Sequence, residues 1–136
     1  METILVVEDD PALRKCMQLC LEKEGYEAVG ISSFEEARIR LLGDRFDLVI
    51  IDYQLSGGKT GLELLVLLKD LNPETPAIVV SGCTERGLAD RALEQGAFEF
   101  LPKPYGFELL KRTCKNALGS KRVAPLPASH CIRDRS

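Results

Sequence analysis

The feature that most constrains the fold is an uninterrupted apolar run at residues 48–51, which ends at the carboxylate of Asp52. A short apolar run without alternation is typical of a strand buried on both faces, as in a parallel sheet. A carboxylate at the end of such a strand is costly to bury unless a cation or hydrogen bonds compensate its charge. We therefore expect Asp52 to be the chemical centre of the protein.

Short apolar strands alternate with helical patterns five times along the chain. The patterns predict strands at residues 4–7, 26–31, 48–52, 77–80 and 98–101, and helices at about 11–24, 34–42, 62–72, 86–95 and 105–118. This order is typical of an α/β sandwich with a parallel central sheet and right-handed crossovers. We expect one domain over residues 1–118, and a largely disordered basic tail over the Pro- and Ser-containing residues 119–136.

The composition excludes several classes of protein. A net charge of −3 gives no nucleic-acid footprint, and no apolar run approaches the roughly 20 residues that span a membrane. Without a signal-peptide pattern, we expect a cytoplasmic protein with neither nucleic-acid nor membrane partners. The five cysteines have no paired spacing, so neither a disulfide framework nor a zinc site is indicated. Cys16 and Cys20 lie in an apolar helical stripe, and we expect them to be small core residues.

Polar side chains follow four of the five predicted strands. They are Glu8 and Asp9 after the first strand, Asp52 at the end of the third, Ser81 after the fourth and Lys103 after the fifth. In doubly wound sheets, ligands bind outside the carboxyl ends of the strands, near the point where the strand order reverses. In the flavodoxin-like order 2-1-3-4-5 the first and third strands are neighbours. This order would place Asp9 beside Asp52, with Ser81 and Lys103 flanking them.

These residue types favour phosphoryl transfer. Clustered carboxylates repel one another and invite a hard divalent cation, for which Mg²⁺ is the natural choice. One carboxylate then remains free to act as a nucleophile towards phosphorus. A hydroxyl and an ammonium would neutralise the oxygens of the transferred group, as phosphoryl transfer requires.

Four motifs in this order resemble the receiver domain of two-component response regulators. They are Val7-Glu8-Asp9, Ile51-Asp52-Tyr53, Ser81-Gly82 and Lys103-Pro104, and the resemblance covers residues 3 to about 118. It implies that Asp52 is the phosphoacceptor, with Asp9, Asp52 and the backbone carbonyl of Gln54 as Mg²⁺ ligands. Glu8 stands where the family more often has Asp, and contact through a metal-bound water remains open to it.

The resemblance also implies a switch and a set of partners. Ser81 would contact the phosphoryl group, Lys103 would pair with it through a loop with a cis Lys103-Pro104 bond, and Phe100 occupies the position of the family's switch aromatic. The phosphoryl donor would be a histidine kinase or a histidine phosphotransfer protein of a phosphorelay. Output would be a homodimer or an effector protein on the face made by residues 86–95, 98–101 and 105–118. Such a protein has no external metabolic substrate and catalyses only its own phosphorylation and dephosphorylation.

Other functions remain alternatives at this point. The loop at residues 55–61 is one residue longer than the commonest receiver form and is similar to receivers attached to hybrid histidine kinases, so a fragment of such a kinase or a passive phosphate sink stays open. An FMN-binding electron carrier needs a phosphate-cradling loop after the first strand, where this chain has Glu8-Asp9-Asp10-Pro11. A phosphohydrolase of the haloacid dehalogenase type needs a second Asp at position 54, where this chain has Gln54.

Overall fold

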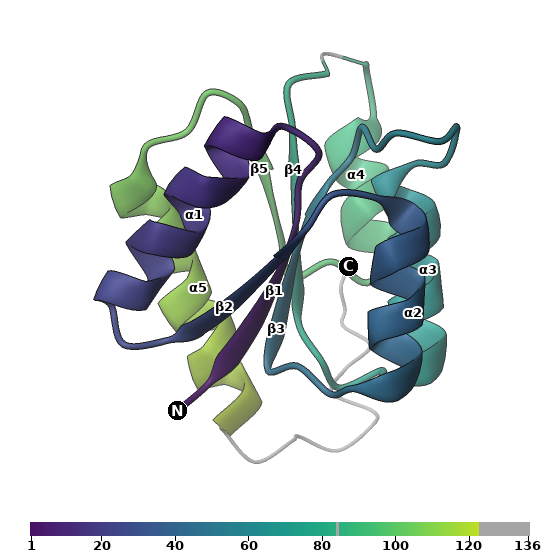
Figure 1. Cartoon of the computed structure of the whole chain (residues 1–136). Helices are drawn as coiled ribbons and strands as arrows, with labels where there is room; N and C mark the ends of the chain where they lie inside the picture. Colours follow the sequence, from purple (N-terminus) through teal and green to yellow (C-terminus); the bar gives the residue numbers. More distant parts are fainter. Residues whose placement is uncertain (84, 123–136) are drawn as a thin grey trace.

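Ten elements alternate along the part of the chain that the structure describes, and they build a parallel sheet between two layers of helices (Figure 1). The computed structural model describes residues 1–83 and 85–122. The strands are β1 (Thr3–Val7), β2 (Glu27–Ile31), β3 (Leu48–Asp52), β4 (Ala77–Ser81) and β5 (Glu99–Pro102). The helices are α1 (Pro11–Lys23), α2 (Phe34–Gly43), α3 (Gly61–Leu71), α4 (Leu88–Glu94) and α5 (Phe107–Arg122). The sheet order is β2-β1-β3-β4-β5, which confirms the predicted flavodoxin-like (βα)5 architecture.

Both faces of the sheet are covered by helices. In Figure 1, α1 and α5 lie on the left of the sheet, and α2, α3 and α4 lie on its right. Side chains alternate along the strands, so that Ile4 and Ile50 pack towards α1 and α5, while Leu5 and Ile51 pack towards α2, α3 and α4. Every residue of β3 is buried, which confirms that the run at residues 48–51 is a strand covered on both faces.

The helices of the first half of the chain begin at side-chain caps that the sequence predicts. Asp10 accepts hydrogen bonds from the backbone N–H groups of Ala12 and Leu13, and Pro11 occupies the first position of α1. The hydroxyl of Ser33 accepts from the N–H of Glu36 at the start of α2. These caps determine where α1 and α2 begin, and so they set the length of the loops that follow β1 and β2.

The last two helices differ from their predicted bounds. The fourth begins at Leu88 rather than residue 86, because Gly87 adopts a left-handed φ of +82° and no side chain caps the helix. The fifth begins at Phe107 rather than residue 105 and continues to Arg122, past the expected end at residue 118. Residues 123–136, the larger part of the expected disordered tail, lie outside the described residues.

The expectation that Cys16 and Cys20 are core residues is wrong for Cys16, which is exposed, whereas Cys20 is half-buried. The buried residues of α1 are Met17 and Leu21, each of which directly follows one of these cysteines. One residue along an α-helix is a rotation of about 100°, which turns Cys16 away from the sheet. The i, i+4 spacing thus predicts the helix, but it does not determine which side of α1 faces the sheet.

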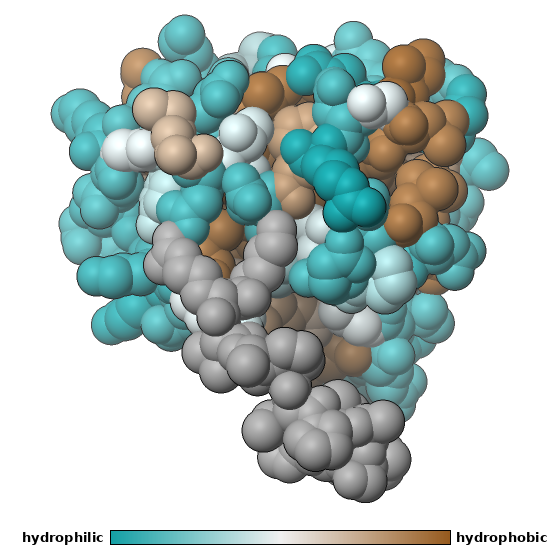
Figure 2. Space-filling model, turned by 90° about the horizontal axis from the view of Figure 1, so that it is seen from below, coloured by the Kyte–Doolittle hydropathy of each residue, from teal (hydrophilic) through white to brown (hydrophobic). Residues whose placement is uncertain are grey.

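Large hydrophobic side chains remain exposed on the outer side of α2 and α3. Ile39 and Leu42 of α2 and Val66 of α3 are all more than 40% exposed. In Figure 2 hydrophobic residues gather on the right, the side on which Figure 1 places these two helices. Among the helices that the structure describes, none has the length and apolar character to cross a membrane.

Candidate functional site

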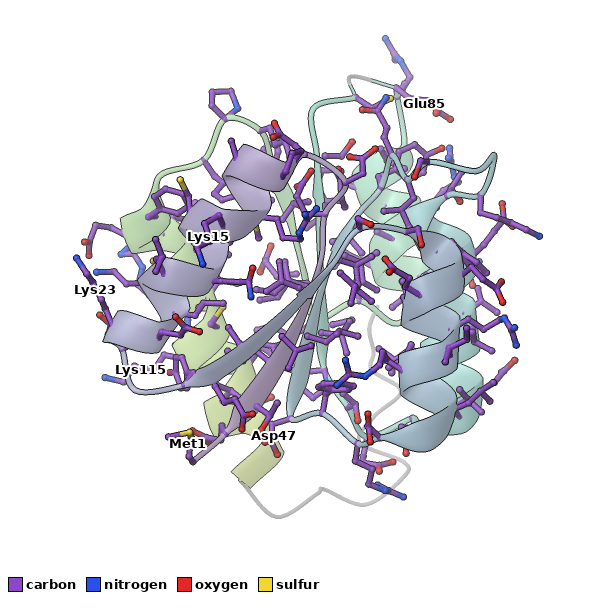
Figure 3. The ribbon with its side chains drawn as sticks, in the orientation of Figure 1. Met1, Lys15, Lys23, Asp47, Glu85 and Lys115 are labelled. Atoms are coloured by element: carbon purple, nitrogen blue, oxygen red, sulfur yellow. The ribbon has the colours of Figure 1, made fainter. Side chains whose placement is uncertain are left out.

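The register of the sheet brings the predicted site residues to one edge. Val7 pairs with Ile51, and Asp52 pairs with Val80, so the ends of β1, β3 and β4 lie side by side. Because the strands are parallel, the loops that follow them meet at this edge, at the top of Figure 3, where Glu85 is labelled. Met1 and Asp47 mark the opposite end of the sheet in the same view.

Asp52 is a buried carboxylate that contacts a backbone N–H group and an ammonium. Only 3% of the residue is exposed. Its Oδ1 atom accepts a hydrogen bond of 3.3 Å from the backbone N–H of Gln54, and its Oδ2 atom lies 3.4 Å from the Nζ atom of Lys103. Burial and the neighbouring Glu8 carboxylate raise the pKa of Asp52 to about 7, although Lys103 and the Gln54 N–H oppose the shift. A cation added among these carboxylates would favour the ionised form of Asp52.

Lys103 joins the two buried carboxylates. Its Nζ atom lies 3.1 Å from Oε1 of Glu8, which is only 1% exposed, and 3.4 Å from Oδ2 of Asp52. Burial would lower the pKa of Lys103, but the Asp52 and Glu8 carboxylates outweigh it and hold the pKa above its usual value. The backbone N–H of Lys103 donates to the carbonyl of Ser81 at 2.7 Å, and the Lys103-Pro104 peptide bond is cis, as the resemblance implies. The ammonium is therefore directed at the carboxylates by the β5–α5 connection.

Three carboxylates form a group that fits a hard cation. Oxygen atoms of Glu8, Asp9 and Asp52 all lie within 4.8 Å of one another. Asp9 is exposed, whereas Glu8 and Asp52 are buried, so the group faces solvent on the side of Asp9. Anionic oxygen donors with one side open to water suit Mg²⁺, which binds through few carboxylates and keeps several of its waters. The donor set of this chain therefore fits the predicted ion.

The other predicted site residues lie around this group. Ser81 is buried, and its hydroxyl oxygen accepts a 2.9 Å hydrogen bond from the backbone N–H of Cys83. Gln54 is exposed beside the acceptor strand and forms an isolated bridge with Thr60. Phe100 lies farther from the carboxylates, on β5, where it is half-buried and packs against the core on the α2–α4 side of the sheet.

Two residues near the site were not predicted from the sequence. The guanidinium of Arg14, on α1, donates from Nη1 to the backbone carbonyl of Glu8 at 2.8 Å. Tyr105 follows the cis peptide bond, and burial, reinforced by the Glu8 and Asp52 charges, raises the pKa of its hydroxyl. A signal for Arg14 does exist in the sequence, because a glycine inside a strand, here Gly30, often marks a place where another group approaches the backbone closely.

An apolar groove adjoins the charged group. It has a volume of about 330 Å³ and is lined by Leu13 of α1, by Lys103, Pro104 and Tyr105 of the β5–α5 connection, and by Phe107 of α5. Lys103 thus borders both this groove and the carboxylates.

Sequence comparison places the chain among signalling proteins. The profile of the response regulator receiver domain matches residues 4–115. The nitrogen assimilation regulatory protein NtrX of Azorhizobium caulinodans is 32% identical over 121 residues, which are 88% of this chain and 27% of the relative. The chain spans between about a quarter and a half of the length of the curated relatives it matches.

Solved structures of receiver domains share the fold. A CheY-like response regulator receiver domain protein from Methanospirillum hungatei JF-1 superposes with a TM-score of 0.85 at 28% identity, covering 89% of this chain and 96% of the other. The beryllofluoride-activated NtrC4 receiver domain dimer superposes with a TM-score of 0.84 at 27% identity, covering 89% of this chain and 99% of the other.

Proposed function

The chain belongs to the response regulator receiver family of two-component systems, and on this premise we propose that it accepts a phosphoryl group on Asp52 from a phosphohistidine of a partner protein. The observation that carries the proposal is the position of Asp52 at the end of β3. It is buried beside two other carboxylates and 3.4 Å from the Lys103 ammonium. That combination supplies a nucleophile, an ammonium that offsets its charge, and carboxylates that would hold a cation.

The proposed transfer is a displacement at phosphorus. A carboxylate oxygen of Asp52 attacks the phosphorus atom, and the P–N bond to the imidazole of the donor breaks. The leaving nitrogen keeps the electron pair of that bond and takes up a proton, while Asp52 becomes an acyl phosphate. In the later hydrolysis, water attacks phosphorus, the P–O bond to Asp52 breaks, and the carboxylate and inorganic phosphate are released.

The residues around Asp52 take distinct roles in this proposal. Glu8, Asp9 and Asp52 would hold Mg²⁺, together with the backbone carbonyl of Gln54. The ion, when bound, supplies positive charge against the phosphoryl oxygens and the carboxylates. Lys103 pairs with the phosphoryl group from the β5 side, and the hydroxyl of Ser81 donates to it from the end of β4.

A histidine kinase or a histidine phosphotransfer protein is the proposed donor. Its phosphohistidine must reach an acceptor that is only 3% exposed, so the donor has to contact the surface next to the carboxylates. The groove beside Lys103 supports this docking, because its other lining residues, such as Leu13 and Phe107, are apolar. We place both events, docking and transfer, in the cytoplasm.

The remaining alternatives have less support. Acidic residues follow β1 where an FMN carrier would need to cradle a phosphate, and Gln54 stands where a phosphohydrolase of the haloacid dehalogenase type would need its second Asp. Attachment to a hybrid histidine kinase is compatible with the proposed chemistry, because the acceptor and its neighbours stay the same. A passive phosphate sink differs only in output, which is tested separately below.

Intact-mass measurement tests the acceptor directly. The wild type, incubated with Mg²⁺ and a small phosphodonor such as acetyl phosphate, should gain the mass of one phosphoryl group. Asp52→Asn should gain none, and chelation of Mg²⁺ should strongly reduce the gain of the wild type. An unchanged wild-type mass, or equal labelling of Asp52→Asn, would overturn the assignment.

A further inference from the structure

Arg14 ties the first helix to the acidic loop. It lies at the end of the first turn of α1 and is half-buried, and its Nη1 atom donates a 2.8 Å hydrogen bond to the backbone carbonyl of Glu8. A partly buried hydrogen bond from a guanidinium to a carbonyl holds the side chain in one orientation, whereas a fully solvated side chain would be free to move. Arg14 therefore reaches back over the loop that carries Glu8 and Asp9.

The neighbouring strand leaves room for this side chain. A Cβ atom added at Gly30 of β2 would lie 3.1 Å from Cγ of Arg14 and 2.5 Å from Oε1 of Gln18. Gln18 in turn donates from Nε2 to the carbonyl of Ala28 at 3.4 Å. Glycine at position 30 thus lets two long side chains of α1 lie against β2, and one of them continues to Glu8.

The contact restrains the peptide unit that joins Glu8 to Asp9. The carbonyl of Glu8 and the N–H of Asp9 belong to one planar peptide unit, so holding the carbonyl holds the orientation of that unit. Glu8 is also held through its N–H, which donates to the carbonyl of Ile31 at 3.0 Å, and through Oε1, which lies 3.1 Å from Nζ of Lys103. Arg14 adds a restraint at the carbonyl of Glu8, directly before Asp9.

We propose that Arg14 is a positioning residue for the metal site, which orients Asp9 by holding the peptide unit between Glu8 and Asp9. The inference rests on the proposed function, because it requires that Glu8, Asp9 and Asp52 bind Mg²⁺. Arg14 does not touch the ion in this role and acts only through the backbone. Groups that orient metal ligands typically change metal affinity by roughly 10- to 100-fold when they are removed.

Two effects of Arg14 on Mg²⁺ binding have opposite signs. As a positive charge near the site, Arg14 repels a cation, so removing the charge alone would tighten Mg²⁺ binding. As a positioning residue it orients a ligand, so removing it weakens binding. A purely structural role would lower the stability of the protein and leave the Mg²⁺ affinity unchanged. The sign of the change in affinity therefore identifies the role.

Mg²⁺ titration followed by backbone amide shifts in NMR spectra measures the affinity without any phosphoryl transfer. Arg14→Met should bind Mg²⁺ about tenfold more weakly than the wild type or worse. Arg14→Lys, whose ammonium can still donate to the carbonyl of Glu8, should recover part of this loss. Lys15→Met is the matched control, because Lys15 is exposed on the same turn of α1 (Figure 3) and its removal changes the net charge equally. This control should bind Mg²⁺ as tightly as the wild type or slightly more tightly.

The spectra of the metal-free variants also test whether each variant is folded, and this separates a loss of Mg²⁺ binding from a loss of structure. Tighter or unchanged Mg²⁺ binding by a folded Arg14→Met would overturn the positioning role while leaving the proposed function intact. Equal weakening by Lys15→Met would also overturn it, because the effect would then not depend on the Glu8 contact. Failure of the wild type to bind Mg²⁺ would overturn both proposals. If Arg14→Met does not fold, Arg14→Lys takes its place in the comparison. An Arg14→Lys variant with the Mg²⁺ affinity and the stability of the wild type would count against the positioning role of Arg14.

Discussion

At the scale of single residues, the three carboxylates are not equivalent. Glu8 and Asp52 are buried and share the ammonium of Lys103 at 3.1 and 3.4 Å. Asp9 lies on the solvent side of the group, and no described ion pair involves it. Burial makes the charge of Asp52 costly in the absence of a cation, as its raised pKa shows. Asp9 adds further negative charge to this group, so like-charge repulsion opposes the metal-free fold, and a bound cation would relieve it.

Replacing Asp9 should therefore separate metal binding from stability. Asp9→Ala should abolish most of the stabilisation by Mg²⁺ and leave the metal-free protein as stable as the wild type or more stable, because like-charge repulsion is relieved. Asp10→Ala is the control in the same loop, since Asp10 caps α1 through the N–H groups of Ala12 and Leu13. It should cost about 0.5–2 kcal/mol with or without Mg²⁺. Urea unfolding with and without Mg²⁺ measures the stability of each variant relative to the wild type. If Mg²⁺ stabilises Asp9→Ala as much as the wild type, Asp9 is not a ligand.

At the scale of secondary-structure elements, the start of α3 is pressed against the acceptor strand. A Cβ atom added at Gly61 would lie 2.4 Å from the carbonyl oxygen of Asp52 and 2.8 Å from Cγ2 of Ile51. The N–H of Gly61 also donates to the carbonyl of Tyr53 at 2.7 Å. The chain thus returns after the loop, at the first residue of α3, to the backbone of the strand that carries Asp52. The position of α3 and the backbone of Asp52 are consequently coupled.

Gly61→Ala should be strongly destabilising, because the obstructing carbonyl is backbone and cannot move aside as a flexible side chain does. We expect a loss of about 1–3 kcal/mol or more, as for other overpacked positions, together with slower phosphorylation of Asp52. Gly119→Ala in α5 is the matched control, because a Cβ there meets nothing within 4 Å. It should raise stability by about 0.5–1 kcal/mol. Urea unfolding checks both, and a neutral Gly61→Ala would contradict the close approach.

The sequence predicts elements well where the signal is local and poorly where it depends on neighbours in space. Apolar runs placed all five strands, and Asp10 and Ser33 marked the starts of their helices because capping is a local interaction. The helix α4 begins after Gly87, later than predicted, because Gly87 has a left-handed φ. The presence of a glycine does not by itself specify this conformation. The exposure of Cys16 depends on the rotation of α1 against the sheet, which its spacing leaves open.

The candidate site follows the same division. Its carboxylates, Ser81 and Lys103 each follow an apolar run, so the parallel topology alone predicts that they meet. Contacts between them were not predictable, because the pairing of Lys103 with Glu8 as well as Asp52 depends on the path of the β5–α5 connection. The contact of Arg14 with Glu8 depends on which side of α1 faces β2.

At the scale of the whole molecule, β4 and β5 connect the site to an outer face. Val79 pairs with Phe100, and the N–H of Lys103 donates to the carbonyl of Ser81 at 2.7 Å. Backbone hydrogen bonds therefore join β4 and β5 as far as the site residues Ser81 and Lys103. We propose that a phosphoryl group draws Ser81 and the β4–α4 connection inward. Phe100, now half-buried, would then turn further into the core. The face formed by α4, β5 and α5 would change with it, as a shift between two populated states.

This shift predicts phosphorylation-dependent association through the α4–β5–α5 face. With Mg²⁺ and beryllofluoride as a stable phosphoryl analogue, NMR shifts should change at Phe100 and along α4 and α5 as well as at the site. A second copy or an effector that prefers this state should in turn stabilise it. For a second copy, sedimentation of the wild type should show a beryllofluoride-dependent increase in mass. Leu109→Glu, which puts a charge on an exposed hydrophobic position of α5, should remove that increase.

The apolar residues on α2 provide the control for this assignment. Ile39→Glu introduces the same charge at a position that is 55% exposed, but on the opposite side of the sheet from α5. It should leave beryllofluoride-dependent association unchanged, because α2 does not contribute to the α4–β5–α5 face. If Ile39→Glu abolishes association and Leu109→Glu does not, α2 and α3 form the interface instead. If the shift changes stop at the carboxylates and leave Phe100 and α5 unaffected, the protein acts as a passive phosphate sink, because phosphorylation would then have no route to any surface that a partner could recognise.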